Sequence, residues 1–308
     1  MLPDTDELPE LLLDLAVPHE DINELVAVRR VLARDPGAVK LLEECVEELV
    51  RGMGAPGEFD ERSRLAERLT AAPAALGRYF PAYVFVAALP YIRAHHLDRG
   101  IPGDISRHTL ADLGRNMAAH RRRHGRGGVL APQWLTLHFR GELYQLGRLQ
   151  FQRVRLDERA VSELAAVGLD ATPGTPCLSL HIADFRGPLS PAACDRSLAL
   201  AREFFPRHYP QERHETAVCH SWLLDPQLKR YLPADSNIVR FQERFRLTHA
   251  SPDDQGREPA DTEPVRFVFA DPDLPVETLP RRTAVERAVG DHLRAGGHWY
   301  IGQGWFPL

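Results

Sequence analysis

Two predicted strands and the helix between them decide the fold class. The first strand and the helix lie in residues 178–210, LSLHIADFRGPLSPAACDRSLALAREFFPRHYP. The first five residues alternate apolar and polar side chains, which is typical of a strand. Ser190 and Pro191 then form a strong helix start, because serine caps helix N-termini and proline is favoured at the first helical position. A second alternating segment follows at residues 216–224. The sequence therefore predicts a strand, a loop, a helix and a second strand in succession.

The N-terminal part of the chain carries only helical patterns. From Asp21 to about His124, apolar residues recur three or four positions apart, which places them on one face of a helix. No strand pattern appears before Gly127. We therefore predict an all-helical domain at residues 1–126.

The sequence changes character at Gly127, and shorter segments with strand-like alternation follow. The predicted strands are 135–139, 149–152, 178–182, 216–224, 265–269 and 299–306, and the helices after the one that starts at Ser190 are 236–247 and 283–295. This order indicates a mixed α/β domain at residues 127–308 rather than the strictly alternating units of a doubly wound fold. The whole chain is thus assigned to the α+β class.

Composition and charge argue against several classes of protein. The 308 residues carry a net charge of −5, unlike the basic domain of a dedicated nucleic-acid binder. The longest apolar run, residues 83–92, is broken by Pro90 and is too short to cross a bilayer. The N-terminus lacks a secretion signal pattern, so we expect a cytoplasmic protein that binds neither nucleic acid nor membrane. No metal site is expected, because no C-x-x-C pair occurs among Cys45, Cys177, Cys194 and Cys219.

Four motifs carry a family resemblance. They are GELYQLGRLQFQ at residues 141–152, CHSWLLDP at 219–226, ADSNIVRFQ at 234–242 and HLRAGGHWYIGQGWF at 292–306. With these motifs the chain resembles bacterial acyltransferase-domain proteins, in which an N-acyltransferase N-terminal helical domain precedes a GNAT-like C-terminal domain. The resemblance covers nearly the whole chain and implies a GNAT-like domain with a splayed central sheet.

The resemblance also implies acyl-CoA as co-substrate. In GNAT-like folds a strand, a loop and a helix N-terminus hold the pyrophosphate of coenzyme A, and the next strand splays away to admit the pantetheine arm. Here these parts are residues 178–182, 183–189, the helix from Ser190 and 216–224. Backbone N–H groups and the helix dipole at such a position attract phosphate. The residues implied to bind the cofactor are Arg186, Gly187, Ser190, Trp222, Asn237 and Arg240.

Two departures from the family pattern concern the loop and the general acid. The usual Gln/Arg-x-x-Gly-x-Gly/Ala loop is replaced by DFRGP at residues 184–188, and Pro188 removes one N–H donor. Many of these enzymes place a tyrosine on the helix after the splayed strand, whereas residues 236–247 contain none and Tyr231 lies just upstream. A thioester on a carrier protein is therefore an alternative donor. A catalytically silent module that binds a metabolite or a partner protein is the alternative function.

Acylation of an amine needs a base, because the acceptor ammonium must lose a proton. A histidine with a pKa near 7 suits this task, and His220, followed by Ser221, is the leading candidate. A core histidine packed beside Trp222 is the other interpretation of His220. Glu142 is a second candidate base, and Tyr231 is the candidate acid. We predict that the amine attacks the thioester directly, since no cysteine has an evident activating partner.

The acceptor is predicted to be a small-molecule amine. Arg148 could clamp an acceptor carboxylate, although the segment from Glu142 to Gln150 could equally form an ordinary solvated face. His181 could bind substrate or orient a carboxylate, and structural satisfaction is its other interpretation. The candidates for acceptor binding are His181, Tyr144, Arg148, Gln150 and Trp305.

Overall fold

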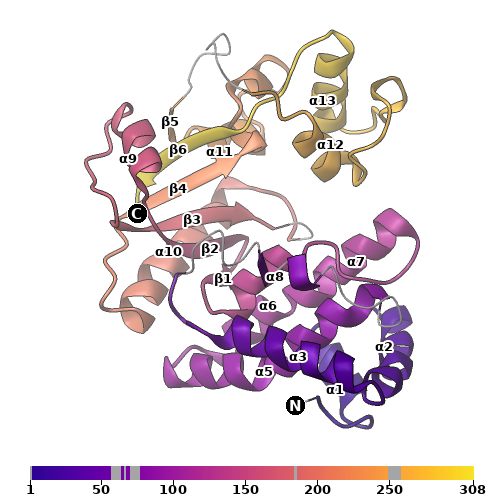
Figure 1. The fold of residues 1–308 in the computed structure, drawn as a ribbon. Coiled ribbons are helices and arrows are strands. Elements are labelled where there is room, and N and C mark those ends of the chain that lie inside the picture. Colours follow the sequence, from indigo (N-terminus) through magenta and orange to yellow (C-terminus); the bar gives the residue numbers. More distant parts are fainter. Residues whose placement is uncertain (1, 57–63, 66, 70–76, 184–185, 249–257) are drawn as a thin grey trace. The chain divides into compact units, whose positions relative to one another are not determined.

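The computed structural model describes residues 2–56, 64–65, 67–69, 77–183, 186–248 and 258–308 (Figure 1). These residues form two compact units, Met1–Gln145 and Leu146–Leu308, and each unit is described by itself. The division lies later in the chain than residues 126–127, where the sequence changes character. The boundary at residues 126–127 stays a prediction about domain organisation.

The described elements of the first unit before β1 are all helices, and the prediction of a helical N-terminal part is confirmed. Its described helices are α1 (Leu8–Asp14), α2 (His19–Leu32), α3 (Pro36–Val50), the 3-10 helix η1 (Gly77–Tyr79), α5 (Phe80–Asp98), α6 (Gly103–Leu110), α7 (Asp112–His124) and α8 (Pro132–Phe139). Helix α5 has no polar face over its first half, and every residue from Phe80 to Leu89 is buried. Such a helix belongs in the middle of a core. The Phe85 ring accordingly packs against Phe139 of α8, with ring centroids 4.8 Å apart.

A buried carboxylate joins three helical segments of this unit. Asp21 of α2 is fully buried, and its Oδ1 accepts hydrogen bonds from the Tyr79 hydroxyl at 2.7 Å and from Arg121 Nη2 at 2.5 Å. A side chain on Gly127 would clash, because a Cβ there would lie 1.8 Å from Asp21 Oδ1. The carboxylate and its partners therefore fix how α2, η1 and α7 meet.

The second unit is built on a mixed sheet, and the prediction of the α+β class is confirmed. The strands are β1 (Leu143–Leu146), which spans the division between the units, β2 (Leu149–Arg155), β3 (Pro176–Ile182), β4 (Thr216–Ser221), β5 (Arg246–Leu247) and β6 (Gly302–Pro307). Their order across the sheet is β1-β2-β3-β4-β6-β5. Strands β3 and β4 run parallel, whereas β2 with β3, β4 with β6, and β5 with β6 run antiparallel.

Helices cover both faces of this sheet. The helices of this unit are α9 (Glu158–Ala165), α10 (Pro191–His208), α11 (Asn237–Gln242), α12 (Thr262–Phe269) and α13 (Ala284–Arg294), with the 3-10 helices η2 (Trp222–Leu224), η3 (Pro226–Arg230) and η4 (Val276–Thr278). On one face α9 packs through Leu164 into a cluster with Cys177 and Trp305. On the other, Phe205 of α10 lies against Phe151 of β2, with ring centroids 6.3 Å apart. Figure 1 shows α9 and α10 on opposite sides of the strands.

The predicted strand at residues 135–139 is wrong, because this segment is helix α8. Pro132 occupies the start of the helix, where its missing N–H is not needed. Thr136 and His138 are as fully buried as their apolar neighbours. The alternation of polar and apolar residues therefore does not separate an exposed face from a buried one.

The predicted strand at residues 265–269 is also wrong, because it forms the end of α12. Val265 is 5% exposed and Phe267 is 46% exposed, so residues two apart point in different directions, as they do on a helix. The predicted helix at 236–247 is shorter than expected, since α11 ends at Gln242 and residues 246–247 form β5. Helix α9 was not predicted, although Asp157 caps it by accepting from the Ala160 N–H at 2.7 Å.

Candidate functional site

The parallel strands β3 and β4 separate soon after they meet. Their register contains two pairs, Leu178 with Ala217 and Ser179 with Val218. Beyond these pairs β3 remains paired with β2 as far as Ile182, and β4 remains paired with β6 as far as Ser221. The two strands thus diverge toward their carboxyl ends, and the predicted splayed sheet is confirmed. Peptide groups along diverging edges can hydrogen-bond an extended ligand.

Helix α10 begins directly after the diverging end of β3. Ser190 caps it by accepting from the Ala193 N–H at 3.4 Å, and Pro191 occupies its first turn. The loop before it includes residues 184–185, which lie outside the described residues. Of the remaining predicted phosphate-binding residues, Arg186 is partly buried and Gly187 is exposed with a φ of 75°. The direction in which a side chain on Gly187 would point is open, because a Cβ there would meet no heavy atom within 4 Å.

Arginine side chains add positive charge around the start of α10. Arg244 donates to the Pro191 carbonyl at 3.2 Å and forms an ion pair with Asp195 at 2.7 Å. Arg148 donates from Nε to the Gly187 carbonyl and from Nη1 to the Ala183 carbonyl, both at 2.9 Å. A helix N-terminus combined with guanidinium groups favours an anion. Arg244 was not singled out from the sequence, because an arginine-rich chain gives no reason to prefer one arginine.

The two candidate histidines lie on the same face of the sheet, one on each diverging strand. Counted from the paired residues, both are two positions beyond the pair of Ser179 and Val218, so they point the same way. The neighbour of His181 on β2 is Gln150, and the neighbour of His220 on β6 is Gln303. The structure therefore places His181 and His220 at corresponding positions on either side of the strand separation.

Neighbouring groups set the pKa of His220 and the tautomer of His181. Partial removal of water from around the imidazole lowers the pKa of His220 below its usual value, because the charged form loses solvation. The Glu163 carboxylate of α9 partly offsets this effect. His220 nevertheless keeps an exposed side chain, so it is not the fully packed core histidine of the alternative interpretation. His181 Nε2 lies 3.0 Å from Gln152 Oε1. An amide oxygen only accepts, so this contact assigns the proton to Nε2 and the lone pair to Nδ1.

The cysteines are unsuited to nucleophilic attack. All four are free and buried. Burial raises the pKa of the Cys177 and Cys219 thiols to about 12, and it also raises the pKa of Cys45 and Cys194. Because the thiolate is the reactive form of cysteine, these side chains stay unreactive near neutral pH.

Other predicted site residues have structural partners. Ser221 accepts from the Leu223 N–H at 3.2 Å and caps η2. Trp222 is buried in a cluster with Leu228 and Trp299. The Trp305 indole donates to the Val167 carbonyl at 3.2 Å within the cluster under α9.

Tyr231 lies in the same cluster region as Trp299, with ring centroids 6.1 Å apart. Its hydroxyl is 2.8 Å from His292 Nδ1, and His292 Nε2 is 3.1 Å from the His298 carbonyl. Since a carbonyl accepts, His292 carries its proton on Nε2 and Tyr231 donates to Nδ1. On α11, Asn237 and Arg240 are exposed, and Arg240 pairs with Glu243 at 3.4 Å.

The segment from Glu142 to Gln150 is not a solvated face, and that alternative is wrong. Glu142 is fully buried in the first unit and pairs with Arg140 Nε at 3.1 Å. Tyr144, also in the first unit, and Gln150, in the second, are buried as well. Sequence reasoning missed Gln152 as a site residue, although the spacing of Gln150 and Gln152 puts them on one face of a strand.

Neither a metal centre nor a membrane segment is found among the described residues. Within these ranges no group of three or more histidine, cysteine, aspartate or glutamate side chains could hold a metal ion. None of the described helices is long and apolar enough to span a bilayer.

Comparisons with known proteins agree with this geometry. The family model of an N-acyltransferase N-terminal domain matches residues 6–141, and that of a GNAT-like C-terminal domain matches residues 143–306. A solved acyltransferase in complex with decanoyl-CoA and teicoplanin is 38% identical, with a TM-score of 0.84 over 100% of this chain and 90% of that one. An acyltransferase mutant with octanoyl-CoA is 38% identical, with a TM-score of 0.83 over 100% and 90%. An acyltransferase with decanoyl-CoA is 39% identical, with a TM-score of 0.82 over 100% and 89%. No curated protein matches the chain.

Proposed function

Because the chain belongs to the acyltransferases that join an N-acyltransferase N-terminal domain to a GNAT-like C-terminal domain, we propose that it transfers a fatty acyl group from acyl-CoA to a small-molecule amine. The observation that carries this proposal is the early separation of β3 and β4, directly followed by the N-terminus of α10. The pantetheine arm would lie between the strands, and the phosphates would lie at the helix start near Arg186 and Ser190.

The donor chain is proposed to be of medium length. The similar solved acyltransferases bind octanoyl-CoA and decanoyl-CoA. An acyl thioester on a carrier protein is the alternative donor. One similar structure also contains teicoplanin, which supports a glycopeptide amine as the acceptor of this chain.

A cytoplasmic location is proposed as well, since all four cysteines are free thiols, as is usual in a reducing compartment.

His220 is the proposed general base. Its lowered pKa keeps the imidazole neutral near pH 7, so it can take a proton from the acceptor ammonium. The amine nitrogen then bonds to the thioester carbonyl carbon, and the carbon–sulfur bond breaks. The attacking nitrogen loses its second proton as the amide forms, and the sulfur, which leaves as a thiolate, takes up that proton. The high pKa values of the cysteine thiols support direct attack rather than an acyl-enzyme.

His181 is the proposed second member of the proton-transfer pair. Its Nε2–H is held by Gln152, so Nδ1 carries the lone pair that can exchange a proton. His181 lies on β3 level with His220 on β4, so the two imidazoles would stand on opposite sides of a thioester held between the strands. This placement supports a role for His181 in proton transfer. In this proposal Tyr231 is not needed as the acid, because its hydroxyl proton is shared with His292.

The donor half of the proposal is tested by calorimetric titration with decanoyl-CoA. Saturable binding with a micromolar dissociation constant is expected, and Arg186→Ala should weaken it about tenfold by removing one charge near the phosphates. Arg202→Ala is the matched control, because Arg202 is an exposed arginine late in α10. Wild-type protein that binds neither decanoyl-CoA nor coenzyme A would rule out the acyl-CoA donor.

A further inference from the structure

The turn between β1 and β2 is attached to helix α10 through one buried hydroxyl. Ser197 of α10 is fully buried, and its Oγ accepts from the Arg148 N–H at 2.8 Å and the Leu149 N–H at 3.2 Å. The same hydroxyl donates to the Ala193 carbonyl at 3.1 Å. Gly147 has a φ of 69°, and a Cβ on it would lie 2.9 Å from Ser197 Oγ. The backbone of the turn is therefore fixed closely against the first turns of α10.

From this fixed turn the side chain of Arg148 reaches the loop between β3 and α10. Its Nε donates to the Gly187 carbonyl and its Nη1 to the Ala183 carbonyl, each at 2.9 Å. Ala183 follows directly on β3, and Gly187 lies four positions before Pro191, the first residue of α10. One planar guanidinium thus ties the two ends of the loop together. Lysine could not do this in the same way, because its ammonium lacks the rigid two-pronged geometry.

The two hydrogen bonds of Arg148 compensate for an unfavourable feature of the loop sequence, the proline at position 188. Pro188 has no N–H, so the peptide that joins it to Gly187 offers only a carbonyl oxygen. A carbonyl oxygen turned toward a phosphate would be repelled. Arg148 holds the Gly187 carbonyl by a charge-assisted hydrogen bond and leaves it pointing at the guanidinium instead.

We propose that Arg148 is a positioning residue for the donor phosphates: it holds the Ala183 and Gly187 carbonyls so that coenzyme A can bind beside the start of α10, without touching the reacting atoms. The inference rests on the proposed use of acyl-CoA. In this role the guanidinium serves the donor rather than a carboxylate of the acceptor. The effect of losing it should therefore depend on whether the donor carries phosphates.

The test compares two donors, decanoyl-CoA and S-decanoyl-pantetheine, which has the same thioester and arm but no phosphate. For Arg148→Gln, we expect KM for decanoyl-CoA to rise about tenfold or more with kcat little changed. With S-decanoyl-pantetheine the same variant should resemble the wild type within about twofold. Arg148→Lys should recover little of the decanoyl-CoA affinity.

Arg155→Gln is the matched control. Arg155 is the last residue of β2, whereas Arg148 immediately precedes the first. The Arg155 Nη1 donates to the Gly174 carbonyl at 3.0 Å, which is not part of the β3–α10 loop. Ser197→Ala is a second variant that loosens the turn while keeping the guanidinium. It should shift KM in the same donor-selective way, by a smaller factor. Thermal unfolding of each variant separates loss of fold from loss of donor binding.

Three outcomes would overturn the inference. If Arg148→Gln and Arg155→Gln both match the wild type with decanoyl-CoA, Arg148 does not position the donor, and the proposed function stands. If Arg148→Gln loses activity equally with both donors, its role is not directed at the phosphates. If the wild type uses the pantetheine donor as well as decanoyl-CoA, the phosphates contribute nothing to donor binding and the inference fails, whereas transfer from acyl-CoA stands.

Discussion

At the scale of single residues, His220 carries the chemical proposal. Replacement by glutamine removes the base but keeps a polar side chain at an exposed strand position. We expect kcat to fall by about 10²- to 10⁴-fold, the usual contribution of a general base. The dissociation constant for decanoyl-CoA should stay unchanged. His108→Gln is the control, because His108 is an exposed histidine in the first unit. A His220→Gln enzyme with wild-type turnover would remove the residue from the mechanism.

The pH dependence of the wild type follows from the same residue. Only neutral imidazole can accept a proton, so the rate at saturating substrate should fall as the pH drops through the pKa of His220 in the complex. Because the pKa of His220 is lowered from its ordinary value of 6.5 in the free protein, the fall should begin at lower pH than for an ordinary histidine. The measurement is a kcat profile from pH 4.5 to 8 with decanoyl-CoA. A kcat that has already fallen to half its maximum at or above pH 6.5 would disagree with this assignment.

The individual histidines could be selected from the sequence, but their relationship could not. His181 and His220 each stand on an alternating segment, which predicts a strand position. That the two lie level requires the register of β3 and β4, which depends on contacts between segments far apart in the chain. The same holds for Gln152 beside His181. Arg148 was selected for its charge, whereas its actual partners are two main-chain carbonyls.

At the scale of secondary-structure elements, β3 and β4 are expected to respond to the donor. Main-chain N–H groups on their diverging edges would become hydrogen-bonded to an extended pantetheine arm and would exchange more slowly. Hydrogen–deuterium exchange with and without decanoyl-CoA should show protection in residues 180–182 and 219–221. Helix α12 is the reference segment and should show none. Protection confined to other segments would mean that the donor does not lie between these strands.

The elements themselves were predicted best where a cap or turn signal accompanied the pattern. Ser190 and Pro191 gave the start of α10 correctly. The strand predictions failed at α8 and α12, where apolar residues two apart were taken as one face of a strand. Over so few residues a buried helix and a strand share the same pattern, and tertiary packing decides between them.

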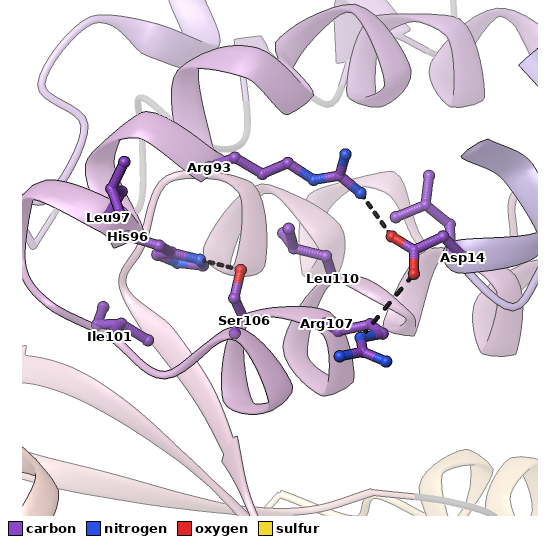
Figure 2. Close-up of a pocket in the computed structure, with 10 residues that line it drawn as sticks. Asp14, Arg93, His96, Leu97, Ile101, Ser106, Arg107 and Leu110 are labelled. Carbon is purple, nitrogen blue, oxygen red and sulfur yellow. Dashed lines mark hydrogen bonds and ion pairs between the residues drawn. The ribbon is translucent and has the colours of Figure 1, made fainter. Parts of the chain in front are cut away.

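In the helical unit, the buried Asp21 carboxylate is expected to contribute to the free energy of unfolding. Asp21→Asn would leave Arg121 and Tyr79 with a weaker acceptor in a buried position, so the free energy of unfolding should fall by about 3 kcal/mol. Asp14→Asn should cost less than about 1 kcal/mol, because Asp14 pairs with Arg93 at the surface. Figure 2 shows this surface pair at the rim of a pocket that His96 and Leu110 also line. Urea denaturation measures both, and equal losses would contradict the structural role of Asp21.

At the scale of the whole molecule, the chain combines a helical unit with a splayed-sheet unit, and both family models match it in that order. The order of the two parts was predictable, because helical and strand-like periodicities occupy separate stretches of the sequence. The end of the first unit at Gln145 was not, since α8 belongs to it and reads as a strand.

The central claim is that this protein moves an acyl group from coenzyme A to an amine. The most direct measurement incubates the protein with decanoyl-CoA and a panel of amine acceptors that includes glycopeptides. Thiol release reports free coenzyme A, and mass spectrometry identifies the acylated product. We expect one N-decanoyl product for each coenzyme A released. Release of coenzyme A as free decanoate forms, or stable binding of decanoyl-CoA with no transfer to any amine, would contradict it.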